Sequence, residues 1–224
     1  MKLQLTIDHG KRHEVINVVD QLADYVDIVE IGFPQIMTFG LDLVKEIHDA
    51  HPNLCICVDT KIYHAGTGLM TRCFDAGASM LTVLSAAPDQ VITKMVEKAK
   101  EHGGQIMCDM SAPPNHVARR TAEVDLLGVD YIAVHTGFIP EYDYDLETHR
   151  SWFTPRVRPL DLAKAAKRNL RNAKLALGTG INEGNIRDVM TLDPEIIMVG
   201  RAIFDTDDRV MAADRMRRYL PFEG

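Results

Sequence analysis

The stretch Leu54-Cys55-Ile56-Cys57-Val58-Asp59-Thr60-Lys61 passes from a short apolar run, which predicts a β-strand, into polar residues. Asp59 and Lys61 are two positions apart, so both side chains project to the same side of an extended backbone. A carboxylate and an ammonium held together in this way form either a structural ion pair or part of a site that binds a metal, stabilises an anion or moves a proton. The other strands of the chain decide between these interpretations.

Similar short runs recur along the chain at fairly even intervals, and most are separated by about 25 residues with an amphipathic helix pattern. One such pattern is Val91-x-x-x-Met95-Val96-x-x-Ala99. Strands that alternate with helices predict a parallel sheet, and eight units in 224 residues favour a single (β/α)8 TIM-barrel domain over residues 1–224. No Gly-x-Gly-x-x-Gly follows the first run, which counts against a dinucleotide-binding fold. The expected strands are Leu3–Ile7, Val26–Ile31, Leu54–Val58, Met80–Leu84, Gln105–Cys108, Tyr131–Val134, Ala173–Leu177 and Ile196–Val199.

Composition narrows the class of protein. The net charge is −7 and the basic residues are spread along the chain, so we expect no nucleic-acid partner. We see no signal peptide and no apolar run near 18 residues, which predicts a cytoplasmic protein with no membrane partner. The cysteines form no C-x-x-C pair and are expected to be reduced core thiols, and they are Cys55, Cys57, Cys73 and Cys108.

One connection breaks the regular spacing. Residues 137–160, after the sixth expected strand, are rich in aromatic, proline and charged residues and contain the single tryptophan, Trp152. A loop of this length in a compact domain is usually a lid or a binding loop, or else it is disordered. Its position on the catalytic side of a barrel favours a lid or a subunit contact over a disordered insertion.

The carboxyl ends of the expected strands carry polar residues, and active sites of barrels lie at this end. The ends are Asp8 after the first strand, Glu30 in the second, Asp59 and Lys61 after the third, Asp109 after the fifth, His135 after the sixth, Gly178-Thr179-Gly180 after the seventh and Gly200-Arg201 after the eighth. One aspartate after a strand is ordinarily a turn or a helix cap, but several carboxylates with a lysine predict a site.

The residue types suggest roles. Glu30 and Asp59 are oxygen donors that suit Mg²⁺, and opposite charges nearby keep Lys61 protonated. His135 can give or take a proton near neutral pH. The structural alternatives are an ion-pair partner for Glu30 and a core histidine bonded to backbone for His135.

The glycines after the last two strands suggest phosphate binding. Phosphate sites of barrels commonly form from these loops, where Gly180 and Gly200 let backbone amides approach the phosphate oxygens. Arg201 can add a forked pair of donors.

These residues resemble the orotidine 5′-phosphate decarboxylase suprafamily, and within it 3-hexulose-6-phosphate synthase and 3-keto-L-gulonate-6-phosphate decarboxylase. The resemblance covers nearly the whole chain, and its segments include residues 1–5, 29–34, 75–78, 82–84, 128–131 and 199–201. Asp109-Met110 and His135-Thr136-Gly137 look closer to the synthase.

The resemblance implies a homodimer whose active sites lie near the interface, with Mg²⁺ on Glu30 and Asp59. It implies a sugar phosphate held by Asp109, by Gly178, Gly180 and Gly200, and by Arg201, with Asp8, Asp59, Lys61 and His135 in catalysis. The expected reaction passes through a 1,2-enediolate, which attacks formaldehyde in the synthase and forms by loss of CO₂ in the decarboxylase.

The chain departs from the suprafamily at one motif position. The family pattern is Asp-x-Lys-x-x-Asp, and here it is Asp59-Thr60-Lys61-Ile62-Tyr63-His64. In the family the last aspartate reaches the neighbouring subunit's site. Histidine at position 64 has three possible consequences: the chemistry is kept with a changed substrate, His64 acts as a new acid or base, or activity is lost. The chain is therefore a synthase-type lyase or, alternatively, a decarboxylase, a pentulose-phosphate epimerase or isomerase, or a non-catalytic sugar-phosphate binder.

Overall fold

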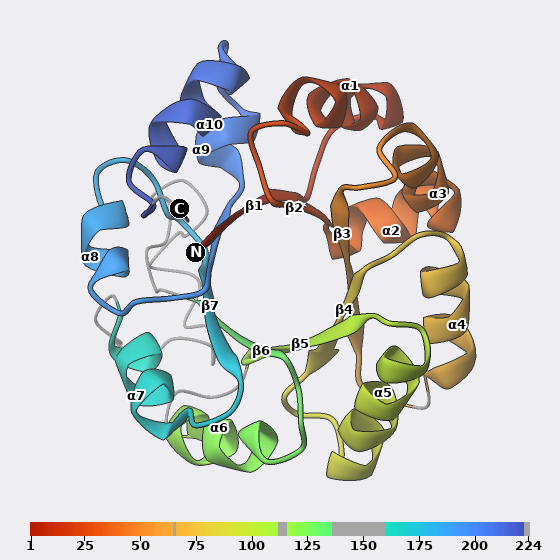
Figure 1. The fold of residues 1–224 in the computed structure, drawn as a ribbon, viewed down its shortest axis with the longest axis vertical. Coiled ribbons are helices and arrows are strands. Elements are labelled where there is room, and N and C mark those ends of the chain that lie inside the picture. The colour runs from red at the N-terminus through yellow and green to blue at the C-terminus, as the bar shows by residue number, and fades with distance from the viewer. Residues whose placement is uncertain (65, 112–115, 136–159, 222–224) are drawn as a thin grey trace, which may run out of the picture.

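The computed structural model is a closed barrel of parallel strands surrounded by helices (Figure 1). The strands pair in chain order, and β1 closes the barrel by pairing with β8. The structure describes residues 1–64, 66–111, 116–135 and 160–221. The strands are β1 (Lys2–Ile7), β2 (Ile28–Ile31), β3 (Cys55–Ile62), β4 (Met80–Leu84), β5 (Gln105–Asp109), β6 (Tyr131–His135), β7 (Lys174–Gly178) and β8 (Ile196–Val199). The predicted (β/α)8 barrel is confirmed.

The helices cover the outer face of the barrel, as the ring around the strands in Figure 1 shows. The amphipathic pattern around Val91 forms α5, which buries Ile92, Met95, Val96 and Ala99. The helices are α1 (Arg12–Leu22), α2 (Phe33–Phe39), α3 (Leu41–Ala50), α4 (Thr67–Asp75), α5 (Asp89–Glu101), α6 (Val117–Asp125), α7 (Asp161–Asn169), α8 (Ile186–Met190), α9 (Arg201–Phe204) and α10 (Arg209–Arg217).

Alternation along the strands separates two apolar clusters. Outward-facing residues such as Leu5, Val58 and Leu81 pack against the helices in the larger cluster. Inward-facing residues fill one half of the barrel and form the smaller cluster, which we call the barrel floor. The barrel floor consists of Ile28, Cys57, Met80, Met107, Tyr131, Ala133, Ala176 and Ile196.

A polar layer lies directly above the barrel floor. On five of the strands, the next inward-facing position, two residues after a floor residue, carries a polar side chain. These positions are Glu30, Asp59, Thr82, Asp109 and His135. Because the strands are parallel, their carboxyl ends meet at one end of the barrel and bring these side chains together.

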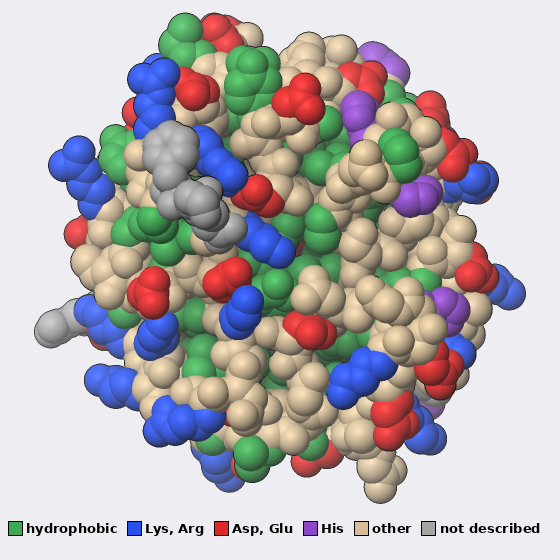
Figure 2. All heavy atoms as spheres, viewed as in Figure 1, with side chains coloured by type: hydrophobic (Ala, Val, Ile, Leu, Met, Phe, Trp, Pro, Cys, Tyr) green, Lys and Arg blue, Asp and Glu red, His purple; other side chains and the backbone are tan. Residues whose placement is uncertain are grey.

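All four cysteines are free thiols, as predicted. The prediction that they lie in the core holds for Cys57, Cys73 and Cys108, whereas Cys55 is only partly buried. In the part of the chain that the structure describes, no helix is long and apolar enough to cross a membrane. On the face shown in Figure 2, acidic and basic side chains are interspersed over most of the surface. The connection around Trp152 lies outside the described residues, apart from Leu160.

Candidate active site

Asp59 and Lys61 lie within β3, which runs four residues further than the apolar run predicts. The Lys61 ammonium Nζ is 3.1 Å from Asp59 Oδ2 and 2.9 Å from Asp109 Oδ2, so two carboxylates share one cation. Although burial lowers the pKa of Lys61, the charges of Asp109 and Asp59 raise it well above the usual range. Lys61 is therefore charged throughout the physiological pH range.

Asp109 connects this pair to the neighbouring strand β6. Its Oδ1 accepts hydrogen bonds from the Ser111 backbone N–H at 2.9 Å and from the Ser111 hydroxyl at 2.6 Å, and it lies 3.2 Å from His135 Nε2. Burial raises the pKa of Asp109, but its contacts with His135 and Lys61 lower it by more, to well below its ordinary value. Asp109 is therefore an ionised acceptor at neutral pH.

Both ring nitrogens of His135 have partners. Nε2 faces Asp109 and the Ser111 hydroxyl, and Nδ1 lies 2.6 Å from the Thr179 hydroxyl oxygen. Since an ionised carboxylate only accepts, Nε2 carries the proton. Burial lowers the pKa of His135, yet the Asp109 carboxylate raises it by more. His135 is thus held in a fixed orientation by an acidic partner, a suitable arrangement for a general acid or base.

Glu30 lies on the opposite side of the barrel interior and is buried, with 8% of its surface exposed. Its Oε2 accepts hydrogen bonds from Gln4 Nε2 at 2.6 Å and from the Thr6 hydroxyl at 2.7 Å. Burial first, and then the nearby Asp59 carboxylate, raise the pKa of Glu30 to about 7. The hydrogen bonds from Gln4 and Thr6 lower the pKa of Glu30, but by less than burial and the neighbouring carboxylate raise it.

This crowding of carboxylates fits a divalent cation. Asp8 follows β1 with its Oδ1 against Gly32, and desolvation and the Asp59 charge raise its pKa too. Among the described residues no cluster of three or more histidine, cysteine or acidic side chains is arranged to hold a metal. Glu30 and Asp59 remain two buried carboxylates close to each other, and a cation such as Mg²⁺ takes one or two carboxylates and completes its shell with waters and substrate oxygens.

The predicted phosphate-binding residues lie at the carboxyl ends of β7 and β8. Gly180 has φ of 68°, a conformation that glycine adopts without strain. A Cβ atom on Gly200 would lie 3.3 Å from the Thr6 carbonyl oxygen, so the backbone passes β1 closely. Gly178 faces inward, where a Cβ atom would lie 2.5 Å from Met198 Cε, and Arg201 is exposed at the first position of α9.

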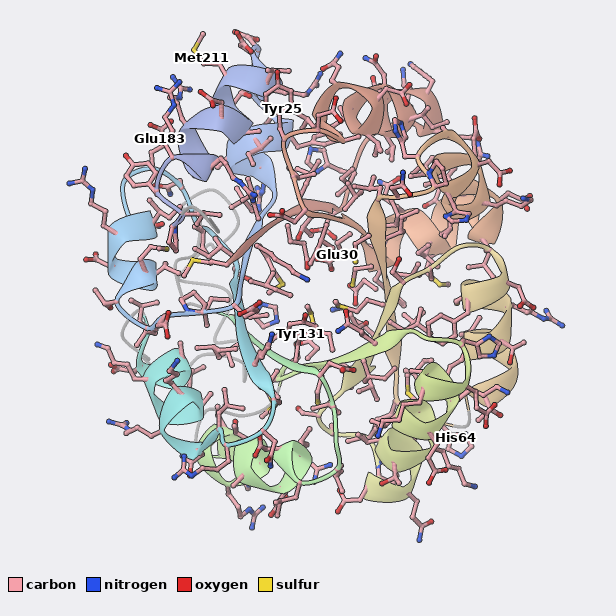
Figure 3. All side chains as sticks on the ribbon, in the orientation of Figure 1. Tyr25, Glu30, His64, Tyr131, Glu183 and Met211 are labelled. Carbon is pink, nitrogen blue, oxygen red and sulfur yellow. The ribbon has the colours of Figure 1, made fainter. Side chains whose placement is uncertain are left out.

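His64 is not brought into this cluster. It follows the end of β3 and is exposed. Figure 3 labels Glu30 and Tyr131 within the ring of strands, whereas His64 lies outside the ring, near α4 and α5. A role for His64 in the site of its own chain has no contact to support it among the described residues.

Sequence reasoning missed the neutral residues of the site. Thr82 donates to Asp59 Oδ1 at 2.7 Å, Ser111 holds Asp109, and Gln4 and Thr6 hold Glu30. Hydroxyl and amide side chains are common at every kind of position, so they stand out only once the inward-facing register is known. For Thr82 the sequence did contain a signal, because this residue lies two positions after Met80 and therefore on the same inward face of β4.

Known proteins match this chain over nearly its full length. A family model for the orotidine 5′-phosphate decarboxylase / HUMPS family matches residues 1–216. The chain is 36% identical over 217 residues to 3-hexulose-6-phosphate synthase of Staphylococcus epidermidis, with 97% of each protein covered. It is 35% identical over 220 residues to the synthase of Bacillus subtilis, covering 98% of this chain and 99% of that protein. The structure of 3-hexulose-6-phosphate synthase from Salmonella typhimurium superimposes with a TM-score of 0.86 at 30% identity, covering 98% of both chains. The chain therefore belongs to the orotidine 5′-phosphate decarboxylase / HUMPS family.

Proposed function

We propose that this protein is a carbon–carbon lyase that acts on a ketose phosphate, joining formaldehyde to ribulose 5-phosphate or reversing that step. The observation that carries the proposal is the connected cluster of Asp59, Lys61, Asp109 and His135, in a chain that is 35–36% identical to 3-hexulose-6-phosphate synthases over its full length. Each of these side chains lies at the carboxyl end of the barrel, where its charge can act on one bound substrate.

His135 moves the proton in this proposal. To form the new bond, a base removes a proton from the carbon next to the ketose carbonyl, the resulting enediolate attacks the formaldehyde carbon, and the formaldehyde oxygen takes up a proton to become the new hydroxyl. In the reverse direction that hydroxyl gives up its proton, the carbon–carbon bond breaks, formaldehyde leaves, and the enediolate takes a proton back at carbon. Because Nε2 faces Asp109, we assign the proton exchange to Nδ1, which lies beside the Thr179 hydroxyl.

Lys61 supplies a fixed positive charge throughout. It stays protonated between Asp59 and Asp109, so it offers a preplaced cation to the negative charge that develops on the enediolate oxygens. Asp59 and Glu30 would hold Mg²⁺, which when bound supplies further electrostatic stabilisation of that anion. Asp8 stands beside this pair, where it can orient a substrate hydroxyl.

The phosphate belongs at the ends of β7 and β8. We place it against the backbone amides near Gly178, Gly180 and Gly200, with Arg201 as its charged partner. The prediction that Asp109 binds the substrate stays a prediction, and both of its oxygens also accept hydrogen bonds from protein donors. We propose that its main task is to hold Lys61 and His135.

The site is proposed to be completed in a homodimer. Phe33, Met37, Tyr63 and Leu69 are exposed large apolar residues in or beside the segments that follow β2 and β3. His64 lies outside the ring of strands, near α4 and α5, and we propose that it meets a second copy of the chain. A cytoplasmic location remains part of this proposal.

The direct test is an assay of the purified protein with formaldehyde and ribulose 5-phosphate. We expect formaldehyde to be consumed and a hexulose 6-phosphate to appear, with the rate abolished by Asp59→Asn and by EDTA and restored by Mg²⁺. Full activity in EDTA would contradict the metal assignment. No formaldehyde consumption under any metal condition would contradict the lyase itself.

Two alternative reactions are distinguished in the same experiment. A decarboxylase would release CO₂ from 3-keto-L-gulonate 6-phosphate. An epimerase or isomerase would convert ribulose 5-phosphate alone, with solvent deuterium entering at a carbon other than C1. A sugar-phosphate binder would bind ribulose 5-phosphate without exchange or turnover.

A further inference from the structure

The pairing of β3 with β4 is irregular at the site. Cys57 and Val58 pair with Met80 and Leu81, and the next pair is Ile62 with Val83. Thus β3 advances four residues while β4 advances two, which is a β-bulge opposite Thr82. Lys61 lies in this bulge with φ of 43°, an unfavourable conformation for a residue that carries a Cβ atom.

Thr82 provides the hydrogen bonds that the broken ladder lacks. Its hydroxyl oxygen accepts the backbone N–H of Lys61 at 2.9 Å, and its carbonyl accepts the Thr60 hydroxyl at 2.7 Å. A hydroxyl has one proton, and that proton points to Asp59 Oδ1 at 2.7 Å. Thr82 is 3% exposed, so water does not replace these bonds.

One buried hydroxyl therefore contacts both members of the charged pair. It holds the carboxylate of Asp59 on one side and the strained backbone of Lys61 on the other. The opposite oxygen of Asp59, Oδ2, is 3.1 Å from the Lys61 ammonium, which closes the arrangement into a ring of contacts. Strained backbone of this kind persists only where neighbouring groups hold it.

We propose that Thr82 is a positioning residue that sets the direction of both Asp59 and Lys61 for the reaction. The effect of Thr82 on catalysis rests on the proposed function. Its effect on the positions of Asp59 and Lys61 can be measured without turnover. Thr82 touches no reacting atom in this proposal. It acts by fixing the carboxylate that would bind the metal and the ammonium that faces the enediolate.

The test compares Thr82→Val, Thr82→Ser and Thr60→Val. Valine keeps the branched shape of threonine and removes only the hydroxyl, whereas serine keeps the hydroxyl. We expect Thr82→Val to lower kcat by roughly 10- to 100-fold, the usual worth of one hydrogen bond to a charged group, with KM changed less. Thr82→Ser should recover most of the rate. Thr60→Val removes the other hydroxyl of the same bulge, which has no contact with Asp59, and should change kcat by less than about threefold.

A second measurement is independent of activity. Lys61 is partly exposed, so the rate at which a small acylating reagent labels it at one fixed pH can be measured by mass spectrometry. We expect Thr82→Val to increase labelling of Lys61, because its side chain becomes more accessible once the hydroxyl that holds both its backbone N–H and its partner Asp59 is removed. Labelling of Lys45, which pairs with Asp49 on α3, should stay unchanged and serves as the internal control.

The outcomes separate the two levels of the proposal. Wild-type labelling kinetics in Thr82→Val would overturn the positioning role, and so would an equal loss of kcat in Thr60→Val, which would assign the effect to the bulge as a whole. Increased labelling in a protein whose wild type has no lyase activity would keep Thr82 as the positioning residue and overturn only the proposed reaction.

Discussion

His135 Nε2 lies 3.2 Å from Asp109 Oδ1, across the adjacent carboxyl ends of β6 and β5. The carboxylate raises the pKa of the imidazole, so replacing it reverses the shift. We predict that Asp109→Asn lowers the pKa of His135, which NMR titration of the imidazole measures directly. An unchanged titration would show that burial alone determines the proton affinity of His135.

The same substitution has a pH-dependent effect on stability. The pKa of Asp109 is lowered in the folded protein, so its stabilisation is present above the unfolded value near 4 and is lost as the pH falls below it. We predict that Asp109→Asn destabilises the protein by about 2 kcal/mol at pH 7. In urea unfolding, the difference from wild type should shrink below about pH 4.

Ser111 donates two hydrogen bonds to the same oxygen of Asp109, one from its backbone N–H and one from its hydroxyl. Removing the hydroxyl in Ser111→Ala takes one donor from the ionised carboxylate, so the pKa of Asp109 should rise towards its ordinary value. NMR titration of the Asp109 carboxyl measures this shift. An unchanged titration would contradict the contact between the hydroxyl and the carboxylate.

Thr179 is the partner of the other ring nitrogen. We predict that Thr179→Val lowers kcat by roughly tenfold, because Nδ1 loses the hydroxyl beside which it takes up and releases a proton. Thr179→Ser retains the hydroxyl and is the matched control. Equal rates for the valine variant and wild type would exclude a part for this hydroxyl in proton transfer.

Glu30 carries a stability penalty in the folded protein. Its pKa is raised to about 7 from an ordinary value near 4.5, so the penalty is absent below the lower value, develops between the two and is complete above pH 7. We predict that Glu30→Gln stabilises the metal-free protein by about 3 kcal/mol at pH 8 and has little effect at pH 4.5. Denaturant unfolding in EDTA at both pH values measures this.

Added Mg²⁺ provides the control for Glu30. It should stabilise wild type at pH 8 in proportion to its binding, and it should stabilise Glu30→Gln much less. Equal stabilisation of both proteins would remove Glu30 from the metal site.

His64 offers a test of the second subunit. Its exposure predicts that His64→Asp changes the free energy of unfolding by less than about 0.5 kcal/mol. If the residue reaches a neighbouring site, the substitution should change the ratio of kcat/KM for formaldehyde addition to that for decarboxylation. Identical ratios in the two proteins would show that position 64 does not select the substrate.

The barrel and its charged residues were predictable because both depend on periodic features. Apolar runs with helical intervals determine strands such as β5, and the strand register then collects Asp59, Asp109 and His135 at one end. The β3 bulge was not predictable, because its cause is the pairing with Thr82 more than 20 positions away. The direction of His64 was hidden for a related reason, since it depends on how the chain leaves that bulge.

The barrel floor also determines where a proton can go. Glu30 lies above Ile28, which is apolar and fully buried, and at the level of Ile28 the amide of Gln4 donates to Glu30. An amide does not take up or release a proton at neutral pH, so the contacts below Glu30 fix its carboxylate without changing its charge. We therefore expect the charge of Glu30 to change through the polar layer above the barrel floor, on the side where a substrate would bind.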